Sequence, residues 1–273
     1  MPLIRFGIPL SVMGLLLKEG IDINLIKSAF LAFFLIGFLI VLINIFPIFK
    51  NKLPNYTLQL AGLIGNTSFL GIPIAIALLP SNTINFTIGF DLGTTLFAWI
   101  FGPFFLKNKT QNKEILKIEG LLNALINSPA SRGIIGVLLA YLFRLDQILG
   151  DFLWIPARIV IALAIIIVGT RLVIITNQKG KIFDLNKEIK YSIFLKLFIF
   201  PFIVFLISKF INFDFYQSSA VILQAGTPTA ISTILMAEAF DVKQKIASKI
   251  LFTTTLISII TIPLLKIFIN AFN

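Results

Sequence analysis

Two prolines inside long apolar stretches, Pro73 and Pro228, mark the places where this chain is best suited to bind a ligand. A proline in a helix interior removes one backbone hydrogen bond and clashes with the carbonyl four residues earlier. Unpaired backbone at membrane depth is tolerated only where it faces protein or a wet cavity. The half-helix ends at such breaks offer backbone donors and a positive dipole end, which together suit an anion.

The residues around both prolines are polar or weaken helices, and they provide the predicted binding groups. Gly65, Ser68 and Gly71 belong to the first break, and Gly226 belongs to the second. An alternative is a pair of structural kinks in which Ser and Thr bond back to their own helices. The predicted substrate-binding residues are Asn66, Thr67, Pro73, Gln224, Thr227, Pro228 and Thr229.

Ionisable residues inside apolar stretches suggest a second chemistry, since a charge within a bilayer is costly and is a functional hypothesis by default. Asp91 lies about 10 Å inside its predicted span, and Thr94 and Thr95 share its helix face. Arg158 lies at a similar predicted depth. Asp91 could couple transport to protons or sodium, the two residues could form an ion pair, or Arg158 could attract a carboxylate. Lys196 is expected to extend from a helix end to the membrane surface.

Several kinds of chemistry are excluded by composition. The chain has no Cys and no His, so thiolate nucleophiles, haem or zinc sites and Ser-His-Asp catalysis are absent. No phosphate-binding loop of the form G-x-x-x-x-G-K-[ST] occurs, which argues against ATP-driven transport. We therefore expect no enzyme activity, no metal site and no cofactor, with proton or sodium coupling left open.

The elements that position these residues are predicted to be membrane-spanning helices. Hydrophobic residues make up 58% of the 273 residues, charged residues only 13%, and the mean hydropathy is +0.99. A membrane-spanning helix needs about 20 apolar residues. The chain is predicted to form a single membrane domain over residues 1–273. The nine predicted spans are 3–17, 25–49, 57–80, 84–106, 128–144, 152–176, 191–211, 218–240 and 246–270.

Basic residues divide unevenly between the two sides of these spans. Fifteen of the 23 Lys and Arg residues fall on the side of the N-terminus and five on the other side. Because positive loops face the cytoplasm, the N-terminus of this chain is predicted to be cytoplasmic and the C-terminus outside. The net charge of +11 is then a topology signal in a multi-pass cell-membrane protein of the bacterial inner-membrane type, and no nucleic-acid partner is needed to explain it.

An internal repeat relates the two halves of the chain. Residues 73–76 (Pro-Ile-Ala-Ile) match residues 228–231 (Pro-Thr-Ala-Ile) at an offset of 155 positions. Spans one to four then correspond to spans six to nine, and the fifth has no counterpart. The expected fold is an all-α polytopic membrane protein with an inverted five-helix repeat and two crossing broken helices, like sodium/proton antiporters and bile acid symporters. Its first helix is expected to be missing from this chain.

The residues at both breaks also resemble a known family. Residues 65–73, Gly-Asn-Thr-Ser-Phe-Leu-Gly-Ile-Pro, are similar to the Asn-x-x-x-x-Gly-x-Pro signature of the auxin efflux carrier family, which includes plant auxin carriers and bacterial malate and malonate permeases. Residues 224–231 and 240–242 resemble its C-terminal element. The resemblance implies an elevator-type transporter that holds a substrate carboxylate where the broken helices cross. By this similarity Asn66, Pro73 and Pro228 are the crossover residues.

The function predicted from these observations is secondary transport of a small organic anion across the lipid bilayer. The scaffold is placed at about 3–17 and 114–176, and the transport core at about 25–106 and 191–270, with a homodimer left open. One alternative is a cation/proton antiporter, although such sites usually pair two acidic residues and Asp91 is alone at depth. Another is a membrane receptor or partner subunit that does not transport.

Overall fold

Helices make up the secondary structure of this protein wherever the computed structural model describes it, which confirms the all-helical class. The described residues are 6–106, 129–157, 159–160, 163 and 185–272, with Ile8 and residues 129–131 described by backbone alone. Their single β feature is an isolated antiparallel bridge between Gly65 and Thr229. Four helices in this part are long and apolar enough to cross a membrane: Ile23–Ile45, Ser81–Leu106, Lys187–Phe210 and Gln244–Phe272.

The first half of the chain contains two long helices separated by a broken one. Asp22 caps α2 by accepting from the backbone N–H groups of Asn24 and Leu25. α2 ends at Ile45, because Phe46 is extended and Pro47 begins a new short helix, so the predicted span 25–49 was too long at this end. The elements are α1 (Ile8–Glu19), α2 (Ile23–Ile45), α3 (Pro47–Lys52), α4 (Tyr56–Leu63), the π-helical turn η2 (Thr67–Gly71), α5 (Ile72–Leu78), the 3-10 turn η3 (Ser81–Thr83) and α6 (Ile84–Leu106).

The second half repeats the order of long, broken and long helix. Asp214 and Gln217 form a reciprocal capping box at the start of α12. The elements are α10 (Lys187–Phe194), the π-helical turn η4 (Leu195–Ile199), α11 (Phe200–Phe210), α12 (Phe215–Ala225), α13 (Ile231–Ala239) and α14 (Gln244–Phe272). A proline lies inside the last long helix of each half, Pro103 in α6 and Pro263 in α14.

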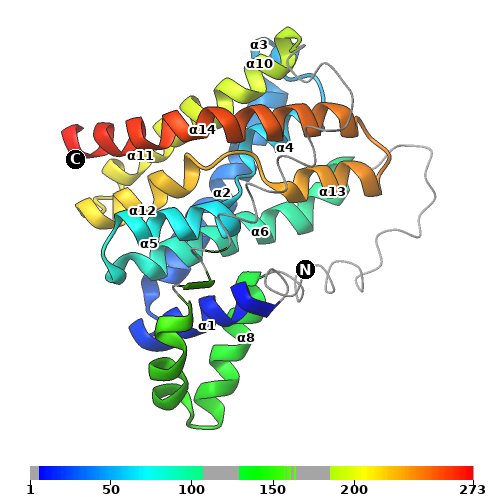
Figure 1. The fold of residues 1–273 in the computed structure, drawn as a ribbon. Coiled ribbons are helices and arrows are strands. Elements are labelled where there is room, and N and C mark those ends of the chain that lie inside the picture. Colours follow the sequence, from blue (N-terminus) through cyan, green and yellow to red (C-terminus); the bar gives the residue numbers. More distant parts are fainter. Residues whose placement is uncertain (1–5, 107–128, 158, 161–162, 164–184, 273) are drawn as a thin grey trace.

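A smaller group of helices lies on one side of this bundle. α8 (Pro129–Leu142) packs along α1, and residues 146–157 are also helical (Figure 1). The contact is close, since a Cβ on Gly133 would lie 2.6 Å from Val12. These helices share a hydrophobic cluster that also includes Ile72 and Ile88 from the main bundle.

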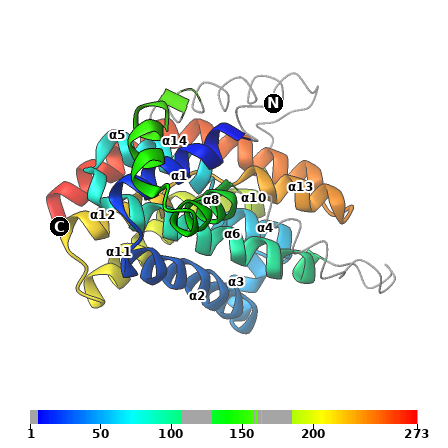
Figure 2. The same cartoon turned by 90° about the horizontal axis from the view of Figure 1, so that it is seen from below.

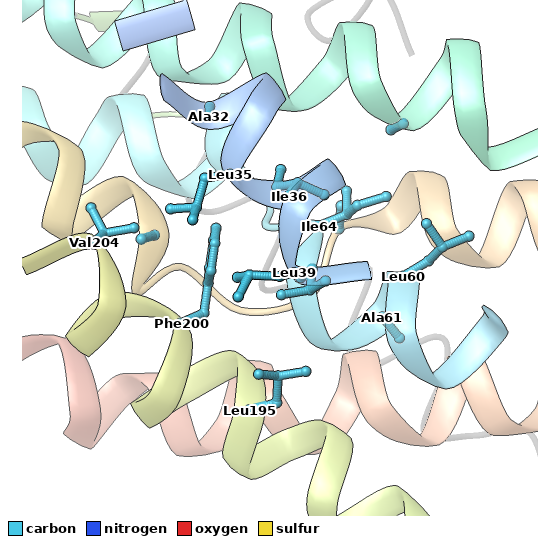
Figure 3. Close-up of a cluster of buried hydrophobic side chains, with 14 of the residues drawn as sticks. Ala32, Leu35, Ile36, Leu39, Leu60, Ala61, Ile64, Leu195, Phe200 and Val204 are labelled. Carbon is cyan, nitrogen blue, oxygen red and sulfur yellow. The ribbon is translucent and has the colours of Figure 1, made fainter. Parts of the chain in front are cut away.

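The main hydrophobic core surrounds the first broken helix. Leu39 of α2, Ile64 after α4 and Phe200 of α11 are among its members (Figure 3). Ile64 is 1% exposed, so the backbone at this break is enclosed by apolar side chains from both halves of the chain. Enclosure of this kind screens the backbone of the break from lipid.

The outer face of α2 is strongly apolar. Phe30, Phe34 and Phe38 follow one another at helical spacing and are each more than half exposed. α2 lies at the edge of the molecule when it is viewed from below (Figure 2). Exposed aromatic side chains in such a stripe fit a surface that contacts lipid, as expected for an integral membrane protein.

The count of nine spans stays a prediction. Predicted spans one and five contain helices of 12 and 14 residues, α1 and α8. Predicted spans three and eight are each divided by a break. The predicted span 152–176 falls mostly outside the described residues.

Candidate functional site

The two breaks meet at the centre of the bundle. The backbone N–H of Asn66 donates to the carbonyl of Pro228 at 2.7 Å, and the N–H of Ala230 donates to the carbonyl of Ile64 at 3.0 Å. We call residues 64–66 and 226–230 the crossover segments. Their pairing satisfies backbone groups that have no helical partner, which a buried break requires.

The first crossover segment lies farther from its proline than expected. The backbone leaves helical geometry at Ile64–Asn66, whereas Pro73 is buried near the first turn of α5. Proline is tolerated there because the first helical residues need no intrahelical donor. A Cβ on Gly65 would lie 2.4 Å from the Thr227 hydroxyl, so the close approach of the second segment requires glycine here.

The second crossover segment does contain its proline, and its hydroxyls bond to backbone. Thr227 donates to the Gln224 carbonyl at 2.7 Å, and Thr229 donates to the Ala61 carbonyl at 2.7 Å. The Thr229 N–H donates to the hydroxyl of Thr254 on α14 at 3.1 Å. Thr227 and Thr229, both predicted to bind substrate, therefore use their hydroxyls to hold this segment together.

Gln224 reaches from the end of α12 across to the first half of the chain. Its Nε2 donates to the Thr87 carbonyl on α6 at 3.2 Å. Its Oε1 is buried and accepts no hydrogen bond from the described residues. A Cβ on Gly71 would lie 1.9 Å from this oxygen, so the glycine of the first motif makes room for the glutamine of the second.

Asp91 is fully buried and contacts the first broken helix. Its Oδ1 accepts from the hydroxyls of Thr67 at 2.5 Å and Ser68 at 2.6 Å. These hydroxyls belong to the turn that follows the crossover segment, which places the carboxylate at the N-terminal end of η2. Arg158, the predicted partner of Asp91, lies outside the described residues.

Lys196 is a functional candidate that the sequence interpretation missed. Its side chain is 0% exposed, and its Nζ donates to the carbonyl of Ala225, the last residue of α12, at 2.7 Å. A Cβ on Gly65 would lie 3.0 Å from the same nitrogen. The prediction that Lys196 reaches the membrane surface is therefore wrong.

The error came from where the helix begins. α10 starts at Lys187, earlier than the predicted 191, so Lys196 is nine residues, about 14 Å, inside the helix. Its position in a π-helical turn is typical of functional sites. The presence of a lysine far inside an apolar helix was the feature of the sequence that could have identified Lys196 as a functional candidate.

Asn66 completes the set of polar groups at the crossover segments. It is 5% exposed, and its side chain makes no capping hydrogen bond to the turn that follows. An asparagine amide offers two donors and an acceptor. Among the described residues no three His, Cys, Asp or Glu side chains cluster in a way that could hold a metal ion. The arrangement instead offers an ammonium, an amide and backbone groups in a buried setting.

Comparison with known proteins shows similarity to membrane transport proteins. The family model described as "Membrane transport protein" matches residues 132–266, which include Lys196 and the second crossover segment. An uncharacterized transporter of Methanocaldococcus jannaschii is 25% identical over 240 residues, or 86% of this chain and 75% of that protein. These findings confirm the predicted resemblance to a membrane transport family.

Proposed function

Because the chain resembles membrane transport proteins, we propose that it is a secondary transporter for a small organic anion that binds at the crossover segments. The observation that carries the proposal is the buried ammonium of Lys196 beside the paired breaks, 3.0 Å from the Cβ position of Gly65. A buried positive charge is costly unless it is paired. Among the described residues no carboxylate forms an ion pair with Lys196; the ion pair in this part of the chain joins Lys18 and Asp151.

A carboxylate substrate would fit this environment. The Lys196 ammonium supplies charge, and the side chain of Asn66, which makes no capping hydrogen bond to η2, supplies a donor. Malate, malonate, another carboxylate or an indole acid all suit such a site. A lysine is a point charge with three donors, one of which already bonds to Ala225, so two remain for an anion.

The finer architecture is part of the same proposal. Both halves run long helix, broken helix, long helix, which supports an inverted repeat with nine spans. The cluster around α1 and α8, which also includes Ile72 and Ile88 of the main bundle, marks where a scaffold at 3–17 and 114–176 would contact a core of 25–106 and 191–270 that moves as an elevator. We place the protein in the cell membrane with a cytoplasmic N-terminus, and a homodimer would form through the scaffold.

The direct test is transport of labelled carboxylates into proteoliposomes that contain the full chain. Saturable uptake is expected, and Asn66→Ala should reduce it at least about tenfold, as expected for loss of about 1.4 kcal/mol of binding. Asn51→Ala is the matched control, because Asn51 lies exposed on α3, away from the crossover segments. Equal flux through the Asn66→Ala variant and the wild type would contradict the site.

A cation/proton antiporter is the second candidate, favoured by the buried Asp91. It predicts that sodium or potassium moves against a proton gradient in liposomes that contain no organic anion. Cation flux under those conditions, with no carboxylate uptake, would replace the anion proposal. A receptor or partner subunit would produce neither flux.

A further inference from the structure

We propose that a groove between α2 and α3 on one side and α10, η4 and α11 on the other binds one anionic phospholipid, with an acyl chain in the groove and the phosphate beside Lys52. None of the residues that line the groove belongs to the crossover segments, so the site does not depend on what the protein transports. The volume of the groove is about 300 Å³, at the lower end of the range for small-molecule sites.

The floor of the groove is apolar and comes from both halves of the chain. Four of the lining residues are each at most 7% exposed: Leu39 and Ile43 of α2, Leu53 after α3 and Leu195 of η4. Phe49 and Phe194 also line the groove, and each of them is about half exposed. Buried residues thus form the bottom and exposed aromatic rings form the edge. A concave apolar surface of this kind fits a single hydrocarbon chain.

Positive charge gathers at one end of the groove. At this end of the bundle α3 packs against α10 (Figure 1). These two helices carry one carboxylate, Glu188, and four lysines, all of them exposed: Lys50, Lys52, Lys187 and Lys190. None of the four forms an ion pair within the part of the chain that the structure describes. The excess of positive charge is complementary to a phosphate.

Lys52 connects the charged end with the apolar groove. Its side chain lines the groove, and its Nζ lies 5.2 Å from the ring centroid of Tyr191, which lines the groove as well. A cation over an aromatic ring is attracted to the face of the ring. This contact holds the ammonium at the mouth of the groove. Because the ring accepts no conventional hydrogen bond on its face, the three donors of the ammonium remain for a phosphate.

The length of the groove fits one leaflet of the membrane. Along α10, η4 and α11 it runs from Tyr191 to Ile203, a distance of about 18 Å along the helix axis. One half of the hydrocarbon core is about 15 Å thick. The four lysines lie on the side that the distribution of basic residues predicts to be cytoplasmic. The cytoplasmic leaflet carries anionic lipids, and basic pockets between membrane helices on this side bind their head groups.

A second groove in the same molecule lacks this combination. It lies between the helix formed by η4 and α11 and the long helix α14, and its volume is about 230 Å³. Phe198, Pro201 and Phe268 line it, and its lining residues in the described part of the chain include no lysine or arginine. We expect this groove to accept the chains of any lipid, because no charge there selects a head group.

The test measures binding of radiolabelled phosphatidylglycerol and phosphatidylcholine with identical acyl chains to the purified full-length protein in a neutral detergent. We expect saturable binding of one phosphatidylglycerol per chain, at least about tenfold tighter than that of phosphatidylcholine. Lys52→Gln should weaken phosphatidylglycerol binding about fivefold, which is the contribution of one lysine near a membrane surface. The same substitution should leave phosphatidylcholine binding unchanged.

Two matched controls accompany the variants. Lys209 is also an exposed lysine over an aromatic ring, with its Nζ 5.8 Å from the centroid of Phe205, but it does not line the groove. Lys209→Gln should therefore bind both lipids as the wild type does. Ile199→Trp should lower binding of both lipids, because a larger side chain at this lining position occupies the space of the acyl chain. Ile259→Trp, on the exposed face of α14, is its control.

Each outcome decides the proposal. Equal binding of the two lipids, or phosphatidylglycerol binding unchanged in Lys52→Gln, overturns it. Competition by glycerol 3-phosphate at equal concentration also overturns it, because the lysines would then hold a small anion without help from an acyl chain. Unchanged binding in folded Ile199→Trp would place the chain outside this groove. Size-exclusion profiles monitor folding, and the exposed Lys52 keeps the test valid if Ile199→Trp misfolds.

Failure of this site and failure of the proposed function are distinguishable. Lipid binding is measured without a transport substrate, so absence of carboxylate uptake would leave the lipid site in place. Carboxylate uptake by a protein that does not distinguish the two lipids would remove the lipid site and keep the function.

Discussion

The two broken helices differ in how their polar groups are used. In the first, the hydroxyls of Thr67 and Ser68 bond to a buried carboxylate on another helix. In the second, the hydroxyls of Thr227 and Thr229 bond to backbone carbonyls. The first break therefore carries side-chain chemistry, whereas the second mainly fixes the backbone. Under the proposed function, the first break would take part in binding and the second would hold the crossover together.

The largest expected effect is that of removing the charge between the breaks. Lys196→Met should lower carboxylate uptake at least about tenfold, because the substituted side chain keeps the volume but loses the ammonium that attracts an anion. Lys209→Met, at the exposed end of α11, is the control. Uptake by folded Lys196→Met protein equal to that of the wild type would mean that Lys196 serves only to cap α12.

Glycine substitutions compare the crowding of the two breaks. Gly71→Ala places a Cβ 1.9 Å from the Gln224 amide, which is held by the Thr87 carbonyl, so stability should fall by about 1–3 kcal/mol. Gly226→Ala meets the flexible end of Leu265 at 2.4 Å and should cost less. Unfolding in mixed detergent micelles measures both. Equal losses would show that the second break is as tightly packed as the first.

Substitutions of Thr229 and Thr67 distinguish a role in stability from a role in transport. Thr229→Val removes the bond to the Ala61 carbonyl and should lower the free energy of unfolding by about 1 kcal/mol, with uptake per folded molecule unchanged. Thr67→Val should instead reduce uptake, because Asp91 loses a donor. Uptake and unfolding assays on the same preparations of both variants measure these two effects. The reverse pattern would exchange the roles we assign to the two breaks.

The smallest effect is expected on α14. Thr254→Val removes the acceptor of the Thr229 N–H, and we expect a loss of about 0.6 kcal/mol, the average measured for side-chain hydrogen bonds within membrane helices. The hydroxyl of the neighbouring Thr255 bonds only within α14, so Thr255→Val should lower the free energy of unfolding by less. A loss for Thr254→Val above that for Thr229→Val would place the main anchor of the second break on α14.

The sequence predicted the elements that matter most, and its errors have physical causes. The polar residues around Pro73 and Pro228 correctly predicted two breaks, and the deep position of Asp91 was recognised. Proline marks where a helix cannot continue normally, but the first break falls at Gly65, where the partner segment needs space. That need arises from residues far away in the chain, so local patterns do not reveal it.

Side-chain roles were harder to predict than backbone ones. Thr227 and Thr229 look like binding residues in the sequence, yet their hydroxyls complete the backbone of the break. Lys196 looked interfacial because the start of its helix was placed four residues late. The hydroxyls of Thr87 and Thr94 have no hydrogen-bond partner among the described residues, although a hydroxyl in an apolar helix normally bonds to its own backbone. Only three-dimensional contacts distinguish a satisfied hydroxyl from an available one.

The bond between Thr229 and Ala61 has a consequence for biosynthesis. It joins residues 168 positions apart, and the backbone pairs around it span similar distances. The first break thus enters the bilayer well before its partner segment has been synthesised. Until then its N–H and C=O groups need water, the insertion machinery or temporary partners. Long-range pairing of this kind forms late, so the crossover is among the last parts of the molecule to assemble, and truncated chains should be degraded rather than accumulate.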